Sequence, residues 1–320
     1  MTDELRRLVS GFQVSQAISV AVTLGIPDLL ADSPRTSDEL AAATDTNPDA
    51  LYRLLRALAS VGVLREHAER RFESTELGDR LRGPGGGFAA LIGRPYFWNA
   101  WAHLIESVRT GENAFRLQHG VDVWEYRSSR PEESAIFDRA MTSHTERMHR
   151  SLVEAYDFGR FSVVVDVGGG RGTLLAALLA EHPHLQGVLF DQPHVVAGAD
   201  VPDRCRVVGG NFFESVPDGG DAYVLKWIVH DWEDEEATAI LRTVRRALPS
   251  HGVVLLVERD LGGPNEAPEA KLSDLNMLVM PGGRERTIEE YERLLQAADF
   301  AFVGVTQVAG GFQVIEAAPA

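Results

Sequence analysis

The stretch FSVVVDVGGGRG, from Phe161 to Gly172, decides the fold of this chain. Its valines form a short β-branched run of the kind that a buried parallel strand needs. The glycines allow a sharp turn, and the residues that follow, TLLAALLAE from Thr173 to Glu181, are strong helix formers. A strand, a glycine turn and a helix predict a nucleotide-binding βα unit, in which backbone N–H groups and a helix N-terminus approach a polar ligand.

The spacing of the glycines separates two kinds of cofactor site. Dinucleotide-binding turns follow G-x-G-x-x-G, whereas Gly168, Gly170 and Gly172 give G-x-G-x-G. Thr173 takes the place of the last glycine, which argues against a nicotinamide dehydrogenase. Asp166 ends the strand, where a negative charge repels phosphates but suits a ligand with an amino group or a sulfonium. A tight turn without a ligand stays open as the alternative.

The composition is that of an ordinary two-domain protein. The chain has 320 residues, 44% of them hydrophobic, and a net charge of −16, which disfavours nucleic acid or an anionic membrane as a partner. The single cysteine, Cys205, precludes an internal disulfide, and its neighbours suggest no metal site. Because no run approaches the ~20 apolar residues of a membrane span and the N-terminus lacks the apolar core of a signal peptide, we expect a cytoplasmic protein.

Residues 1–87 predict a mainly helical, winged-helix-like domain. Apolar residues spaced i, i+3, i+4 and i+7 give a first helix one stripe: Leu5, Leu8, Val9 and Phe12. A capping box at Thr36–Glu39 and a cap at Asn47–Pro48 open two further helices, and RRFESTELG, Arg70 to Gly78, resembles a β wing. The stripe favours burial against a partner subunit.

A winged-helix outline also raises the possibility of a DNA-binding regulator. Between Thr36 and Arg82 there are nine acidic residues and seven arginines, whereas a DNA-reading surface is strongly basic. The charge balance favours packing or dimerisation. A regulator that senses a metabolite is kept as the non-enzymatic alternative.

An aromatic-rich segment, 88–150, follows the expected flexible joint at Gly83–Gly87. We expect it to form a helical connector that contributes to an acceptor pocket, because aromatic rings line pockets for flat organic ligands. Core packing is the alternative for each ring. The candidates for contact with an acceptor here are Trp98, Phe137 and Met141.

Strands and helices alternate through residues 151–320, which predicts a doubly wound parallel α/β sheet with its ligands beyond the carboxyl ends of the strands. The later strand candidates are 187–191, 206–208, 222–227 and 252–258, with helices at 235–248 and 287–300. Two apolar runs on either side of Gly310–Gly311 predict a closing antiparallel hairpin.

Polar residues follow several of these strands. Asp191, about 20 residues after the glycine turn, can accept hydrogen bonds from two ribose hydroxyls, or can cap the next turn. Asn211 and Phe212 can respectively bond to and pack against a purine, with core packing the alternative for Phe212. The fourth strand closes with Lys226 and Trp227.

His230 follows that strand and is the candidate base. An unperturbed imidazole has a pKa near 6.5, suited to taking a proton from a hydroxyl. Glu258 ends the fifth strand and Glu285 precedes another helix, so two carboxylates can hold the base in orientation. Asp231 is expected to cap the helix after Trp232 rather than to act in catalysis.

Six motifs, in this order and spacing, carry a resemblance: VVDVGGGRG, FDQPHV, GGNFFESVP, LKWIVHDW, VERD and DLNMLVMPGGRERT. The chain resembles the plant-type family of S-adenosylmethionine-dependent small-molecule O-methyltransferases, especially its actinobacterial natural-product members. The resemblance implies a Rossmann-like methyltransferase domain, an N-terminal dimerisation domain and a homodimer. It also implies S-adenosyl-L-methionine as cofactor and no metal.

The same resemblance implies roles for particular residues. His230 would deprotonate the acceptor hydroxyl, flanked by Glu258 and Glu285. Family members bind the methyl donor through residues that match Gly168, Asp191, Phe212 and Lys226. The further candidates are Asp166, Gly170, Asn211 and Trp227 for the methyl donor, and Asn276 and Met280 for the acceptor. Asn211 departs from the family, which usually has aspartate there. Because the family includes members that hydroxylate or catalyse pericyclic steps, those reactions stay an alternative, as does N-methylation.

Overall fold

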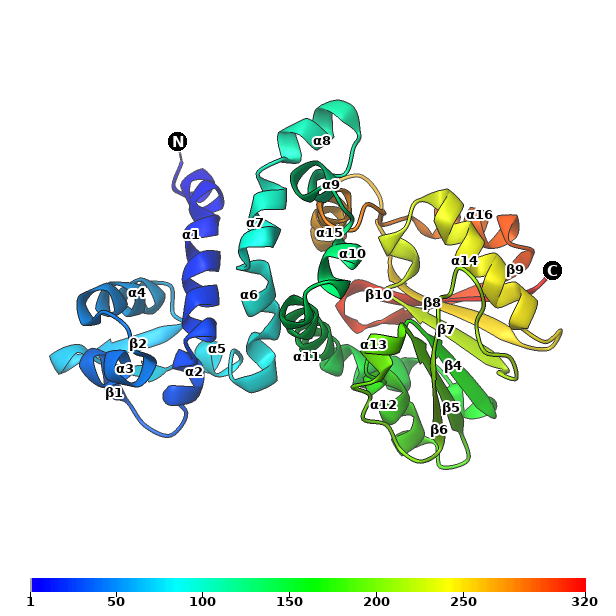
Figure 1. The fold of residues 1–320 in the computed structure, drawn as a ribbon, viewed down its shortest axis with the longest axis horizontal. Coiled ribbons are helices and arrows are strands. Elements are labelled where there is room, and N and C mark those ends of the chain that lie inside the picture. Colours follow the sequence, from blue (N-terminus) through cyan, green and yellow to red (C-terminus); the bar gives the residue numbers. More distant parts are fainter. Residues whose placement is uncertain (1) are drawn as a thin grey trace. The chain divides into compact units, whose positions relative to one another are not determined.

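A computed structural model describes residues 2–320, apart from the side chains of residues 142–147. The chain forms two compact units, whose elements are labelled in Figure 1. One comprises Met1–Asn99 and Arg127–His144, the other Ala100–Tyr126 and Thr145–Ala320. Within 88–150 the described residues form helices and turns, as expected of the connector, while the domain boundaries at 87 and 150 stay predictions.

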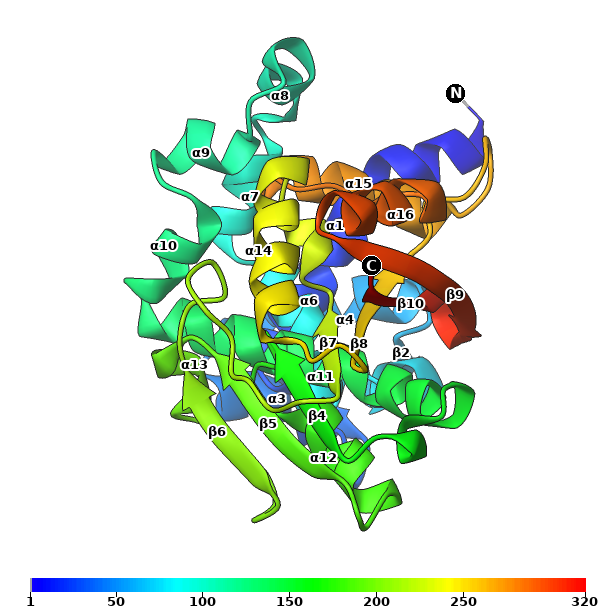
Figure 2. The same ribbon diagram turned by 90° about the vertical axis from the view of Figure 1, so that its right-hand side faces the viewer.

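The larger unit is built on a seven-stranded sheet of order β6-β5-β4-β7-β8-β10-β9 (Figure 2). The parallel strands are β4 (Val163–Val167), β5 (Gln186–Asp191), β6 (Cys205–Gly209), β7 (Ala222–Lys226) and β8 (Val253–Arg259). The antiparallel hairpin is β9 (Phe300–Val308) and β10 (Phe312–Pro319), with β10 paired to β8. The predicted doubly wound sheet and its closing hairpin are confirmed.

Helices cover both faces of this sheet, because side chains alternate along each strand. Val165 and Val167 of β4 pack in one core with α14 and α16, whereas Val164 packs in another with α12 and the end of α11. The helices wholly or partly in this unit are the end of α7 (Pro95–Trp101), α8 (Leu104–Thr110), α9 (Ala114–His119), α10 (Val123–Ser128), α11 (Pro131–Ala155), α12 (Thr173–Glu181), α13 (Pro193–Val196), α14 (Asp234–Ala247), α15 (Pro268–Val279) and α16 (Ile288–Ala297).

The strand order positions the site. After central β4 the chain adds β5 and β6 on one side, then returns to add β7 and β8 on the other. The glycine turn therefore follows the strand at which the order reverses. Open α/β sheets bind their ligands at this point.

The smaller unit packs helices against a three-stranded antiparallel sheet of order β1-β3-β2. The predicted caps are present: Thr36 forms a capping box with Glu39, and the Asn47 side chain accepts a hydrogen bond from the Ala50 N–H. Its elements are α1 (Asp3–Thr23), α2 (Ile26–Leu29), β1 (Arg35–Thr36), α3 (Ser37–Thr44), α4 (Pro48–Ser60), β2 (Leu64–His67), β3 (Arg71–Ser74), α5 (Glu76–Asp79), α6 (Gly87–Ile92), the start of α7 (Pro95–Trp101), the end of α10 and the first part of α11. The wing is the β2–β3 hairpin, and the end of the predicted wing segment is helical instead.

The expected flexible joint at Gly83–Gly87 has a tight, locally helical backbone. Gly83–Gly86 form a 3₁₀ helix that leads directly into α6. A Cβ at Gly85 would lie 2.2 Å from the Arg80 carbonyl oxygen. The glycines are needed here because the backbone approaches itself closely.

The apolar stripe of α1 is exposed in the single chain. The exposed fraction is 74% for Leu8, 60% for Val9, 54% for Phe12 and 48% for Leu5. Among the described residues no helix, α1 included, is long and apolar enough to cross a membrane. An apolar stripe of this kind on a domain surface marks a protein contact.

Candidate active site

The glycine turn after β4 depends on backbone conformations that favour glycine. Gly168, Gly170 and Gly172 have φ values of +72°, +61° and +86°. A Cβ at Gly168 would lie 2.3 Å from Ile228 Cδ1, and one at Gly172 would lie 2.2 Å from Val201 Cγ1. The turn is thus both left-handed and closely packed, so a side chain at Gly168 or Gly172 would be strained and would have to displace Ile228 or Val201.

Asp191, at the carboxyl end of β5, is tied to this turn. Its Oδ2 accepts a hydrogen bond from the Gly170 N–H at 2.8 Å, and its Oδ1 accepts one from the Gln192 N–H at 2.6 Å. The carboxylate therefore caps its own turn and also holds the glycine turn, while its role toward ribose hydroxyls stays a prediction. Each carboxylate oxygen has a further lone pair with which it can accept a ligand hydroxyl.

Asp166 and Lys226 place opposite charges at the ends of neighbouring strands. Asp166 is only 1% exposed, and neither carboxylate oxygen has a hydrogen-bond partner among the described residues. Burial raises its pKa to about 7, and the positive charge of Lys226 opposes that rise. Burial likewise lowers the pKa of Lys226, against the pull of Asp166 and Glu258. A buried, unsatisfied carboxylate is the kind of group that a ligand donor completes.

Asn211 and Phe212 follow β6. The Asn211 amide oxygen accepts a hydrogen bond from the Phe213 N–H at 3.0 Å, and its amide nitrogen donates to Glu214 Oε1 at 3.2 Å. The Phe212 ring packs edge to face with Trp232, at a centroid distance of 5.9 Å. Phe212 also borders the glycine turn, because its Cε1 lies 4.0 Å from the Cβ position of Gly168.

Trp227 turns the chain sharply where β7 ends. Its φ of +57° is unusual for a bulky residue, and such strain costs about 1–3 kcal/mol. The indole stacks on the His230 imidazole, with centroids 6.3 Å apart and planes inclined by 14°, and Lys226 Nζ lies 5.2 Å from the indole centroid. The strained turn therefore carries the chain from the cofactor end of β7 to the candidate base.

The structure brings His230, Glu258 and Glu285 together. His230 lies in the 3₁₀ helix Val229–Asp231, and all three residues are buried. His230 Nδ1 is 3.0 Å from Glu285 Oε1 and 4.0 Å from Glu258 Oε2. Nδ1–H thus donates to Glu285, which leaves Nε2 as the nitrogen able to accept a proton.

The carboxylates set the charge of this cluster. Burial by itself lowers the pKa of His230, but Glu285, Asp231 and Glu258 outweigh it and raise that pKa to about 10. Burial raises the pKa of Glu258 to about 7, with His230 opposing the rise. Although burial acts to raise it, the pKa of Glu285 is lowered by the charge of His230 and by hydrogen bonds from His230 and Ser273. The carboxylates therefore favour the protonated form of His230, and the neutral imidazole gains population as the pH rises toward that pKa.

The three residues also resemble a metal-binding group, because one ligand atom from each lies within 4.8 Å of the others. Two ligands of one tetrahedral zinc are about 3.3 Å apart, given metal–ligand bonds near 2.0 Å. The 3.0 Å separation of His230 Nδ1 and Glu285 Oε1 is instead that of a hydrogen bond. The geometry fits a shared proton.

The expected role of Asp231 as a helix cap is wrong. Helix α14 begins at Asp234 with Glu233 as its N-cap. Asp231 Oδ1 instead lies 3.4 Å from His230 Nε2. The prediction failed because the chain makes a 3₁₀ turn at Val229–Asp231 before the helix, which moves the start of α14 onward.

Sequence reasoning also missed two residues of α15 that hold Glu285. The Ser273 hydroxyl donates to Glu285 Oε1 at 2.7 Å, and Asp274 Oδ1 accepts a hydrogen bond from the Glu285 N–H at 3.0 Å. One signal was available: Ser273 precedes the candidate Asn276 by three residues, so a helix puts both on one face.

The predicted acceptor contacts are divided between the two units. Asn276 is half-buried on α15, and Met280 is buried at the end of that helix. Trp98, Phe137 and Met141 belong to the smaller unit, where Trp98 packs edge to face with Phe12 and the Phe137 ring lies 3.8 Å below the Arg127 guanidinium. That these five residues line one pocket stays a prediction.

The strand ends fit a cofactor that carries ribose and an amino acid moiety. Asp191 presents acceptors for hydroxyls, and Asp166 is an unsatisfied buried acceptor for a cationic group. Beside them is a buried imidazole held by carboxylates. The fold and the site together are typical of one class of protein, an enzyme that binds a nucleoside cofactor.

Comparison with known proteins identifies the family. The O-methyltransferase domain matches residues 101–301, and the O-methyltransferase dimerisation domain matches residues 6–82. The chain belongs to the S-adenosylmethionine-dependent O-methyltransferase family. The predicted enzyme class and cofactor are confirmed.

Individual relatives resemble the chain over nearly its whole length. The phenazine O-methyltransferase of Lysobacter antibioticus is 40% identical over 98% of this chain and 95% of its own. The O-demethylpuromycin-O-methyltransferase of Streptomyces alboniger is 42% identical over 99% of this chain and 89% of its own. An O-methyltransferase from neocarzinostatin biosynthesis, solved with S-adenosylmethionine and 2-hydroxy-5-methyl naphthoic acid, is 33% identical, covers 96% of each chain and has a TM-score of 0.82.

Proposed function

We propose that this enzyme methylates a hydroxyl on an aromatic secondary metabolite, with His230 as the general base. The hydrogen bond from His230 Nδ1 to Glu285 carries the proposal, because it leaves Nε2 to take the acceptor proton. When bound, S-adenosylmethionine supplies an electrophilic methyl group on a sulfonium. General-base help of this kind contributes about 10²–10⁴-fold to the rate.

The carboxylates around His230 have separate tasks in this proposal. Glu285 fixes the tautomer and the ring orientation, while Asp231, 3.4 Å from Nε2, stabilises the imidazolium that forms. Glu258 Oε1 accepts hydrogen bonds from the Ile228 and Val229 N–H groups, at 3.2 and 2.9 Å, which ties the turn bearing the base to β8. Deprotonation therefore takes place in a cluster that is already built.

Several residues are proposed to hold the cofactor and the acceptor. Asp191 and the glycine turn, Gly168 and Gly170, bind the nucleoside, and Asp166 with Lys226 faces its charged end. Phe212 packs against the purine of the cofactor, and Asn211 forms a hydrogen bond with that purine. Trp227 borders the reacting centre. The acceptor meets Trp98, Phe137, Met141, Asn276 and Met280.

An aromatic acceptor is supported by the relatives. Two of those enzymes are named for a phenazine and for O-demethylpuromycin, and the third was solved with 2-hydroxy-5-methyl naphthoic acid. The phenazine and the naphthoic acid are flat, fused aromatic rings. Aromatic side chains are suited to binding such rings.

The smaller unit is proposed to form a homodimer. The match to the dimerisation domain and the exposed stripe of α1 support this assignment. Light scattering should give the mass of two chains, and Leu8→Asp together with Val9→Asp should shift the mass toward one chain. A wild-type protein of single-chain mass at micromolar concentration would overturn it.

A product assay tests the reaction itself. Purified enzyme, S-adenosylmethionine and a panel of hydroxylated phenazines and naphthoic acids should yield products heavier by one methylene unit, and amino analogues of the same rings should not react. A product that gains oxygen, or keeps its mass, would favour the hydroxylation or pericyclic alternative. Methylation of the amine instead would change the acceptor class.

A further inference from the structure

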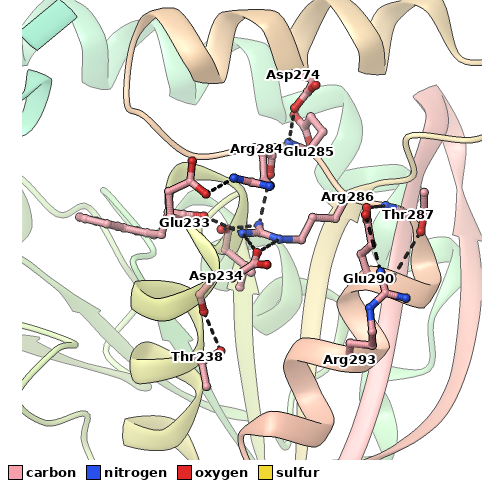
Figure 3. Close-up of polar contacts among 12 residues, drawn as sticks. Glu233, Asp234, Thr238, Asp274, Arg284, Glu285, Arg286, Thr287, Glu290 and Arg293 are labelled. Carbon is pink, nitrogen blue, oxygen red and sulfur yellow. Dashed lines mark hydrogen bonds and ion pairs between the residues drawn. The ribbon is translucent and has the colours of Figure 1, made fainter. Parts of the chain in front are cut away.

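Arg286 is a buried cation close to His230. Its side chain is 1% exposed, and its guanidinium donates five hydrogen bonds. Nε and Nη2 bind Asp234 Oδ1 at 3.0 and 2.8 Å, as Figure 3 shows. The remaining three reach the carbonyl oxygens of Val229 at 3.1 Å, Arg284 at 3.2 Å and Trp232 at 2.8 Å.

These carbonyls bracket the candidate base. Val229 precedes His230 and Trp232 follows Asp231. The planar guanidinium of Arg286 therefore binds the turn that carries His230 on both sides of it. The backbone of Gly283 also lies close to this turn, because a Cβ there would lie only 2.2 Å from the His230 carbonyl oxygen. The segment Gly283–Arg286 therefore packs directly on the backbone that carries the imidazole.

The backbone of Arg286 makes a second connection. Its carbonyl oxygen accepts a hydrogen bond from the Leu261 N–H at 3.1 Å, just beyond the end of β8. Glu258 lies on β8, and Glu285 is the neighbour of Arg286 in sequence. One residue thus links the three segments that supply His230, Glu258 and Glu285.

The burial of this charge argues for more than stability. The carboxylate that pairs with it, Asp234, is 65% exposed, and its other acceptors among the described residues are neutral carbonyls. Replacing a buried ion pair with apolar side chains is often neutral or stabilising. An apolar side chain could therefore fill this position without loss of stability. Only arginine offers the rigid set of five donors that binds Asp234 and the three carbonyls together.

We propose that Arg286 is a positioning residue that holds His230 in register with Glu285 and Glu258. It acts through the carbonyls of Val229 and Trp232 and touches neither substrate nor cofactor. The proposal rests on His230 being the base, and it concerns the placement of that base.

Chemical rescue tests the proposal. Arg286 lines a cavity of about 310 Å³ that also borders Arg284 and Arg293, so a small cation can reach the space left by Arg286→Ala. We expect that variant to lose about 10²-fold in kcat, the effect of a 1 Å misplacement, with unchanged affinity for S-adenosylhomocysteine. Millimolar guanidinium should restore part of kcat, while methylammonium and sodium should not.

A second variant and a control keep the test decisive. Arg286→Lys retains the positive charge without the planar set of donors, so its kcat should stay low with or without guanidinium. This variant also provides the test if Arg286→Ala fails to fold. Arg284→Ala removes a neighbouring arginine whose side chain pairs with exposed Glu233, and it should keep wild-type kcat. Wild-type kcat in Arg286→Ala or Arg286→Lys would overturn the proposal. So would a loss that tracks melting temperature and is not rescued.

Histidine NMR separates this inference from the proposed function. The His230 ring resonances, identified by their loss in His230→Gln, should move in Arg286→Ala and return with guanidinium, because they report ring position whatever the role of the ring in turnover. If His230→Gln keeps wild-type turnover, the base assignment fails while the positioning result stands. Unmoved resonances would overturn the positioning role alone.

Discussion

The glycine turn and the His230 cluster meet at one edge of the same sheet but are built differently. The turn is held by backbone conformation and by Asp191, which lies 21 residues from the Gly170 N–H that it binds. The cluster is held by side chains from distant segments, with His230 and Glu285 separated by 55 residues. The first is built from local contacts and is the part to which we assign cofactor binding. The second is built from long-range contacts and is the part to which we assign proton transfer.

Removing the base should produce the largest effect and should divide the two regions cleanly. We expect His230→Ala to lower turnover about 10²–10⁴-fold, the usual contribution of a general base. Calorimetry should find unchanged affinity for S-adenosylhomocysteine, because the glycine turn does not depend on the imidazole. His194→Ala, at an exposed histidine of α13, is the matched control. Wild-type turnover in His230→Ala would end the assignment of the base.

Neutralising Glu285 should alter the cluster without destroying it. A base works unprotonated, so kcat/KM should rise with pH through the pKa of His230, which the carboxylates raise. Glu285→Gln removes the carboxylate that contributes most to raising this pKa, so the rising limb of the pH–rate profile should move to lower pH. A hydrogen bond to a charged group contributes about 1.5–3 kcal/mol, so the maximal rate should fall about ten- to a hundredfold. A profile that stays in place, or moves to higher pH, would contradict this reading.

Filling the glycine turn should disturb binding instead of proton transfer. Gly168→Ala combines left-handed strain of about 1–2 kcal/mol with the 2.3 Å approach to Ile228. We expect affinity for S-adenosylhomocysteine to fall about tenfold or more, with kcat at saturating cofactor much less affected. Gly219→Ala is the control, since Gly219 has φ of +89° but open space around it. Equal affinities in the two variants would mean that Gly168 is not part of the cofactor site.

The smallest expected effect concerns Asn211. Its amide oxygen already accepts the Phe213 N–H, and a carboxylate there would make a stronger bond to a donor on the cofactor. Asn211→Asp should tighten S-adenosylhomocysteine binding by about two- to fivefold, worth about 0.5–1 kcal/mol. Competition binding against the wild type would detect it. Weaker binding would show that the local turn, rather than the cofactor, sets the choice of asparagine.

The same contrast explains what could be predicted from the sequence. Gly168, Asp191 and the β9–β10 hairpin have local signatures in glycine spacing, strand period and turn residues. The sheet and the presence of three cluster residues at its edge followed from strand ends and from the family resemblance. Asp231 was misjudged, because a 3₁₀ turn displaced the helix that it was expected to cap.

Arg286 and Ser273 could not be recognised in the same way. Arg286 binds carbonyls 54 and 57 residues away, and backbone carbonyls leave no mark in a sequence. Ser273 meets Glu285 only because a helix and a loop fold back on each other. Contacts of that kind follow from tertiary packing.

The strand order also bears on how the enzyme is made. β8, which carries Glu258, pairs with β7 on one edge and with β10 on the other. As the polypeptide leaves the ribosome, β4 and β5 can pair early. One edge of β8 stays unpaired until β10, residues 312–319, has emerged. Such an edge invites pairing with other nascent chains. The β4–β5 pair, next to the turn that we assign to cofactor binding, can therefore form first. The strand that carries Glu258 has an unpaired edge for longer and depends longer on protection by chaperones.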